Sequence, residues 1–172
     1  MVRHSSPFGG RYSRYVLSIL LFGLLGPVVL SQWGVLYSFL SVLFAALITI
    51  GYDRLIFQIA KQKSTKIVRE QCSLIVHAMK PGSERKGFLV ITENFVLFAP
   101  NWNKIKTILD TEQIVRHEFN GHHVELTVRF PNKHRMFQFY VSSPERTKQM
   151  LTEKSGESLP YKYDKMESNK MV

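Results

Sequence analysis

Residues 15–52 have the sequence YVLSILLFGLLGPVVLSQWGVLYSFLSVLFAALITIGY, with no Asp, Glu, Lys, Arg or His. A bilayer core about 30 Å thick needs roughly 20 apolar residues per helix, so the stretch is too long for one comfortable span and suits two short ones. The polar turn Ser31-Gln32-Trp33-Gly34 divides it, and Pro27 is expected to help end the first helix. The sequence therefore predicts a transmembrane helical hairpin with spans at 15–30 and 34–52.

Basic residues flank this hairpin on both sides, and the turn between the spans carries no charge. Arg3, Arg11 and Arg14 precede the hairpin, and Arg54, Lys61, Lys63, Lys66 and Arg69 follow it. The positive-inside rule then places the N-terminus (1–14) and the C-terminus in the cytoplasm, in a plasma or inner membrane. A cleaved signal peptide is the less favoured interpretation, because a second apolar stretch follows at once. Low cysteine content and compact organisation favour a bacterial inner membrane.

The chain beyond the hairpin has a different composition. All 13 acidic residues lie at or after Asp53, and the whole chain has a net charge of +10. A basic domain held at a membrane faces anionic lipid, which makes lipid headgroups the favoured counter-charge over nucleic acid. The single cysteine, Cys72, excludes an intramolecular disulfide and a cysteine-based zinc site.

Periodicity changes twice after the hairpin. Residues 53–70 continue at helical spacing, which predicts a juxtamembrane basic helix with Lys61, Lys63 and Lys66 at headgroup depth. From residue 71 the pattern alternates, as in strands, and Asn120-Gly121 is a hairpin turn signal. Ser143 and Pro144 predict the start of a closing helix, with Ser143 as its cap. Residues 155–172 form a polar tail that we expect to be flexible.

Three stretches resemble a known family. They are KGFLVITENFVLFAP (86–100), ILDTEQIVRHEF (108–119) and VELTVRFPNKHRMFQFYVSSPERTKQML (124–151). Together they are similar to the GRAM and bacterial PH-like group of the pleckstrin-homology-like superfamily. The resemblance implies an α+β domain over 71–154, a bent antiparallel sheet or partly open barrel capped by a C-terminal helix. Members of the superfamily are binding modules without catalysis.

The resemblance also implies where a ligand would bind, namely at basic loops on the open end of the sheet. The corresponding residues are Lys80, Arg85 and Lys86, then Lys104 and Lys106, then Lys133, His134 and Arg135. Three basic turns on one rim would form a phosphate cradle, whereas the alternative is that exposed turns simply tend to carry Lys and Arg. Trp102 is either a membrane-inserting or partner-contacting aromatic, or an anchor folded onto the sheet.

Catalytic and metal chemistry have little support in the sequence. There is no Gly-rich phosphate loop, nucleophile elbow or paired-carboxylate motif, so we expect neither an enzyme nor a cofactor. His122 and His123 are adjacent and would point to opposite faces of a strand. His117 and His123 could face each other across the Asn120-Gly121 turn, but no nearby acid or cysteine completes a metal site.

These observations predict a non-enzymatic membrane-anchored adaptor whose domain contacts anionic lipid or a protein partner, with homo-oligomerisation left open. The alternative is an accessory subunit that packs through its hairpin against a larger membrane complex such as a transporter, using small residues as the interface. Nucleic-acid binding is a third and weaker hypothesis, because no aromatic platform is interleaved with the basic turns.

Overall fold

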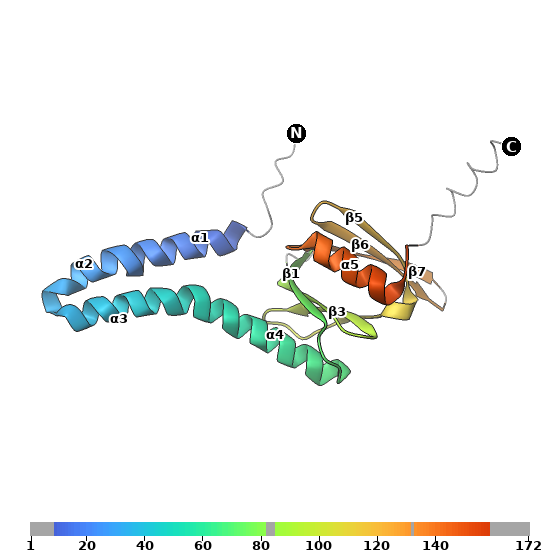
Figure 1. Ribbon diagram of the computed structural model, residues 1–172, viewed down its shortest axis with the longest axis horizontal. Helices are drawn as coiled ribbons and strands as arrows, with labels where there is room; N and C mark the ends of the chain where they lie inside the picture. The colour runs from blue at the N-terminus through green and yellow to red at the C-terminus, as the bar shows by residue number, and fades with distance from the viewer. Residues whose placement is uncertain (1–8, 82–84, 132, 159–172) are drawn as a thin grey trace. The chain divides into compact units, whose positions relative to one another are not determined.

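The computed structural model describes residues 9–81, 85–131 and 133–158, and the chain forms two compact units, Met1–Ile59 and Ala60–Val172. Two long apolar helices come first, and a seven-stranded antiparallel sheet and a C-terminal helix follow (Figure 1). Most of the tail that we expected to be flexible lies outside the described residues.

The first unit is a helical hairpin. Its first arm contains α1 (Gly9–Ser18), a π-helical stretch (Ile19–Leu25), α2 (Gly26–Leu30) and a 3₁₀ turn (Ser31–Trp33); the second contains α3 (Val35–Ala46), a π-helical stretch (Leu47–Gly51) and α4 (Tyr52–Val68). The helices at 12–33 and 35–68 are long and apolar enough to cross a membrane, by length and composition alone. Both are longer than the predicted spans, and the predicted helical continuation past Asp53 is confirmed.

Pro27 does not end the first helix, contrary to our expectation. The preceding turn is π-helical, and the Gly26 N–H donates to the Leu21 carbonyl five residues back. In this register the next bond would run from residue 27 to Phe22, but proline has no N–H to donate. The Ser41 hydroxyl donates to the Phe22 carbonyl instead, at 2.6 Å. A side chain of the other arm thus satisfies the carbonyl that Pro27 leaves open, and the helix continues.

Small and polar residues of the hairpin point toward the opposite arm. A Cβ on Gly26 would overlap the Ser41 hydroxyl, so the glycine gives that hydroxyl access to the backbone. Ser38 donates to the Pro27 carbonyl at 3.0 Å. At the open end of the hairpin, Asp53 accepts hydrogen bonds from Arg14 and from Tyr15. The two arms are therefore joined by polar contacts along their length.

Replacing Ser41 with alanine is expected to weaken the hairpin by about 0.6 kcal/mol, the average for hydrogen bonds between membrane helices, and by at most about 1.7 kcal/mol. The Phe22 carbonyl would then lack its partner, and in a bilayer lipid would offer no replacement. Titration of the micelle-bound protein with a denaturing detergent, followed by circular dichroism, measures the effect. Ser31→Ala is the matched control, because the Ser31 hydroxyl bonds within its own turn to Val28. Equal midpoints for the two variants would contradict the role given to Ser41.

The second unit contains one sheet and one closing helix. Its elements are β1 (Leu74–Lys80), β2 (Arg85–Ile91), β3 (Phe95–Pro100), β4 (Thr107–Asp110), a 3₁₀ turn (Thr111–Gln113), β5 (Ile114–Asn120), β6 (His123–Phe130), β7 (Lys133–Val141) and α5 (Pro144–Ser155). All neighbours are antiparallel, in the order β4-β3-β2-β1-β7-β6-β5. The strands predicted by the alternating pattern after residue 71 and the closing helix are confirmed. Strand β7 begins at Lys133.

The sheet curls strongly. In a flat sheet the edge strands β4 and β5 would lie six spacings apart, roughly 29 Å at about 4.8 Å each. The connection from Asp110 to Ile114 has four steps and spans at most about 14 Å. The rings of Phe98 on β3 and Phe139 on β7 are likewise only 5.7 Å apart across three spacings. The sheet therefore bends until its two halves face each other, as the resemblance implied.

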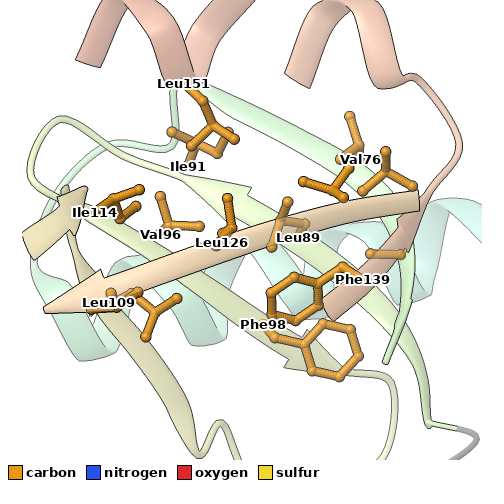
Figure 2. Packing of buried hydrophobic residues seen from close by; sticks show 14 residues of the cluster. Val76, Leu89, Ile91, Val96, Phe98, Leu109, Ile114, Leu126, Phe139 and Leu151 are labelled. Atoms are coloured by element: carbon orange, nitrogen blue, oxygen red, sulfur yellow. The ribbon is translucent and has the colours of Figure 1, made fainter. Parts of the chain in front are cut away.

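The core fills the space inside this bend. Figure 2 shows its apolar side chains, including the Phe98 and Phe139 pair and Leu151 from α5. Helix α5 begins at Pro144 as predicted, but Ser143 makes no side-chain cap. The Ser143 carbonyl instead accepts hydrogen bonds from both the N–H and the hydroxyl of Thr147.

The outer face of β2 and β3 is also buried. Phe88, Val90, Leu97 and Ala99 alternate with the core residues and so point away from the core, yet none is exposed. In α4, Ala60 and Ser64 lie about one helical turn apart and are buried as well. We infer that the part of α4 from Ala60 onward covers this apolar face, so that β2 and β3 are sandwiched between two layers.

Candidate functional site

Two of the three predicted basic clusters meet at one end of the first half of the sheet. Strand β1 ends and β2 begins there, with Lys80 paired to Arg85, and β3 ends beside Gly87 before the connection to β4. We define the basic end as Lys80, Arg85, Lys86, Lys104 and Lys106. The β1–β2 connection also contains one acid, Glu84, which lies outside the described residues.

Lys80 links the strands at this end. Its side chain lies on the core face of β1 because it follows Val76 and Ala78 at two-residue spacing. The ammonium donates to the Thr107 hydroxyl of β4 at 3.2 Å and lies 5.6 Å from the centre of the Phe137 ring of β7. An ammonium has three donors, and Thr107 takes one. Lys80 therefore offers donor capacity to an anion at the mouth of the bent sheet.

The other members of the basic end differ in direction and exposure. Lys104 and Lys106 are exposed on the connection between β3 and β4. Lys86 is exposed on the outer face of β2, opposite to the core, because it alternates with Gly87. Arg85 is the first residue of β2. Lys80, Arg85 and Lys86 thus belong to strands. Lys106 directly precedes β4, and Lys104 lies within the connection.

The third cluster is not in a turn and is offset from the other two. Lys133, His134 and Arg135 form the start of β7 and are exposed. At about 3.4 Å per residue they lie roughly 7 to 14 Å along the strand from Phe137, which contacts Lys80. Arg135 lies 5.7 Å over the Phe130 ring, at the tip of the β6–β7 hairpin. Lys133, His134 and Arg135 therefore do not supply the third basic turn that a cradle of three turns would need.

The opposite end of β1–β4 is acidic. The residues around it, at 70–73, 92–94 and 110–113, include Glu70, Glu93, Asp110 and Glu112 and no Lys or Arg. Asn94 donates to Glu70 through its side chain at 2.8 Å and through its backbone at 3.2 Å, and these bonds hold the pKa of Glu70 below its usual range. Glu93 pairs with Lys154 of α5 at 2.6 Å and raises the pKa of that lysine. The two ends therefore differ in charge, with Arg69 beside Glu70 and Lys154 paired to Glu93 as the basic residues at the acidic end.

Trp102 lies in the same connection as Lys104 and is 76% exposed. The alternative that it is an anchor folded onto the sheet was wrong.

Thr107 and Phe137, the two contacts of Lys80, were missed by the sequence reasoning, because their approach depends on the curl of the sheet.

His117 belongs to the structural framework. In the sheet it pairs with Leu126, while His123 pairs with Asn120, so the two histidines do not face each other across the turn as we had considered. His117 is buried, and its Nε2 lies 3.3 Å from the Thr152 hydroxyl of α5. Burial, with a smaller contribution from Lys148, lowers the pKa of His117. Among the described residues, no three His, Cys, Asp or Glu side chains form a group that could hold a metal ion.

The lowered pKa predicts that acid weakens the sheet unit. In the unfolded chain His117 takes up a proton near its ordinary pKa of about 6.5, whereas the folded protein resists protonation, so stability is complete above that pH and falls below it. Hydrogen exchange of β5 and α5 amides between about pH 8 and about pH 5, corrected for intrinsic rates, measures the change. His117→Gln should flatten the profile, and the exposed-site control His134→Gln should not. An identical profile for both variants would refute the assignment.

Comparisons with known proteins give no family. No protein-family model and no curated protein matches the chain. Among solved structures, the C-terminal domain of an unknown protein from Leishmania infantum aligns with a TM-score of 0.46 and 11% identity, over 58% of this chain and 97% of that one. The complex of the FERM and C-terminal domains of Drosophila Merlin gives 0.40 and 13%, over 48% and 28%. The DH/PH domains of p115-RhoGEF give 0.43 and 10%, over 87% and 56%. Similarity at this level carries no argument about function.

Proposed function

We propose that this chain is a non-enzymatic, membrane-anchored binding module, in which the basic end of a PH- or GRAM-like domain contacts anionic lipid headgroups. The observation that carries the proposal is the separation of charge between the two ends of β1–β4, with Lys80 at the mouth of the basic one. Each Lys or Arg near an anionic membrane surface contributes about 1 kcal/mol of attraction. Several such residues on one end favour a single orientation of the domain toward that surface.

The hairpin supplies the anchor in this proposal. The basic flanks of the two apolar helices favour a cytoplasmic location for both termini, with the Ser31–Trp33 turn outside. An anchored domain meets the membrane surface at a high effective concentration, so that a weak electrostatic contact is sufficient. This arrangement agrees with a site that has a few exposed lysines.

The alternative, an accessory subunit of a larger membrane complex, receives less support. It relied on the small residues of the hairpin as an interface, but Gly26, Ser38 and Ser41 make contacts between the two arms of the hairpin itself. A complex partner would have to contact the apolar outer surface, which is equally suited to lipid. If the basic end instead binds a protein, the following experiment should show no binding to anionic vesicles.

Co-sedimentation of residues 60–172 with lipid vesicles tests the proposal. We expect binding to vesicles of phosphatidylcholine and phosphatidylserine, weak binding to phosphatidylcholine alone, and loss of binding at high salt. Lys80→Met keeps the apolar stem next to Phe137 and removes the charge. At about 1 kcal/mol per lysine, it should weaken binding about fivefold.

The matched control is Lys148→Met, which removes the same charge from an exposed position on α5. It should reduce binding much less than Lys80→Met if the basic end makes the contact. Equal losses for the two variants would show that only net charge matters. Absence of binding to anionic vesicles at low salt would contradict the proposal and direct attention to a protein partner.

A further inference from the structure

The connection between β3 and β4 exposes a large aromatic side chain. Trp102 has the most exposed large apolar side chain in the described part of the chain from Ala60 onward; Met136, the next, is 59% exposed. An indole that is mostly in water gains free energy when it moves to a membrane interface, where its ring is buried and its N–H stays hydrated. The position of Trp102 therefore needs an explanation beyond packing of the domain.

The base of this connection is held in place on both sides. The Asn101 N–H donates to the Lys86 carbonyl at 3.1 Å, on the side of β3. On the side of β4, the Thr107 hydroxyl accepts from Lys80. Trp102, Asn103 and Lys104 are exposed between these two points. The fold thus presents the indole from a fixed base, at the same end as the lysines of the proposed lipid contact.

The chemistry of the tip matches one kind of surface. Residues 101–106 are Asn-Trp-Asn-Lys-Ile-Lys, with two lysines and no acid. An anionic bilayer offers phosphates and carboxylates to ammonium groups at its surface, and an amphipathic layer just below to an indole. A soluble phosphate would complement the lysines and leave the indole in water. The combination of charge and exposed aromatic area favours an assembled bilayer over a free headgroup.

We propose that Trp102 inserts into the headgroup region of the bilayer that holds the hairpin, so that the basic end recognises an anionic membrane surface and not a soluble phosphate. The inference rests on the proposed function and adds to it an apolar contact with the membrane. Lys104 and Lys106 would bring the connection to the surface, and the indole would hold it there.

Fluorescence of the full chain in lipid nanodiscs tests this inference. The chain has two tryptophans, so Trp33→Phe leaves Trp102 as the only one. In discs of phosphatidylcholine and phosphatidylserine with brominated acyl chains, we expect a blue-shifted emission and loss of intensity relative to unbrominated discs. Because each disc presents one bilayer, quenching must come from the membrane that holds the hairpin. Lys104→Gln together with Lys106→Gln should reduce the quenching.

The control moves the probe to another exposed site. Trp33→Phe, Trp102→Phe and Gln149→Trp together place the only indole on α5, where we expect no quenching. Unquenched Trp102 in every disc would overturn the inference, while the vesicle binding of residues 60–172 could still hold and keep the proposed function. Equal quenching in discs of phosphatidylcholine alone, or a blue shift produced by inositol hexakisphosphate in detergent without bilayer, would also overturn it.

Discussion

Phe139→Ala is expected to lower the free energy of unfolding of the sheet unit by about 3–5 kcal/mol. Phe139 is fully buried, and its ring packs 5.7 Å from Phe98, joining the two halves of the curled sheet (Figure 2). Truncating a buried phenylalanine to alanine costs about 3–5 kcal/mol, because apolar contacts are lost and a cavity remains. Domains of this size are stable by only about 5–15 kcal/mol. The substitution should therefore remove a large share of the stability of the unit.

Hydrogen exchange of the slowest sheet amides in the detergent-solubilised chain measures this loss, since those amides exchange only on global unfolding. The control is Met136→Ala on the same strand, where the side chain is 59% exposed and the expected change is within about 0.5 kcal/mol. Unchanged protection in Phe139→Ala would mean that the two halves of the sheet are not held together by this core.

Gly87→Ala is expected to destabilise the same unit by about 2–3 kcal/mol, although it adds a single methyl group. Gly87 lies in β2 opposite Pro100 of β3. A Cβ at this position would lie 2.7 Å from the Pro100 Cα and closer still to the Ala99 carbonyl oxygen, both of them backbone atoms. Because backbone in the middle of a sheet cannot rotate away as a side chain can, the β2–β3 pairing has to shift.

The same exchange experiment, read at β2 and β3, tests the glycine. Ala78→Gly is the matched control, since Ala78 pairs with Gly87 from the other side, in β1. Removing that methyl from a buried strand position should cost only about 1 kcal/mol. If Gly87→Ala were as stable as the natural chain, the close approach of β2 and β3 at Pro100 would be wrong. A shift of that pairing would also move the base of the connection that carries Trp102.

Alternation and turn signals in the sequence were sufficient to predict the strands. In β6, Val124, Leu126 and Val128 alternate with polar residues, because one face of that strand packs on the core and the other does not. The Asn120-Gly121 turn has Gly121 in the left-handed region at φ 59°, as its residue type predicts. Local patterns of this kind report which face of a strand is buried.

Local patterns carry less information where two elements from distant parts of the chain meet. The apolar runs of β2 and β3 are continuous because both of their faces are buried, but nothing in them identifies α4 as the cover. The expectation that Pro27 ends a helix failed because the Ser41 hydroxyl, which replaces the missing hydrogen bond, comes from fourteen residues away and is not visible in the local pattern. His117 was considered as a neighbour of His123 across the turn, because nothing local to His117 in the sequence indicates its contact with Thr152 of α5.

The basic residues illustrate the same limit. Their identity was visible in the sequence, but their grouping depended on the curl of the sheet, which joins Lys80 to Thr107 and leaves Lys133 to Arg135 at the tip of another hairpin. Charged residues at the end of a hairpin can equally belong to the turn or to the strand. Because the pairing of β6 with β7 already begins at Phe130 and Lys133, the residues from Lys133 to Arg135 belong to the strand.

The proposed double crossing of the membrane is tested directly by cysteine labelling in intact cells. In a Cys72→Ser background, which leaves no other thiol, Gln32→Cys reports on the turn of the hairpin and Lys148→Cys on the sheet unit. A membrane-impermeant maleimide should label the first variant in intact cells and the second only after permeabilisation. Labelling of the Lys148→Cys variant in intact cells, or recovery of the protein in the soluble fraction without detergent, would contradict the account.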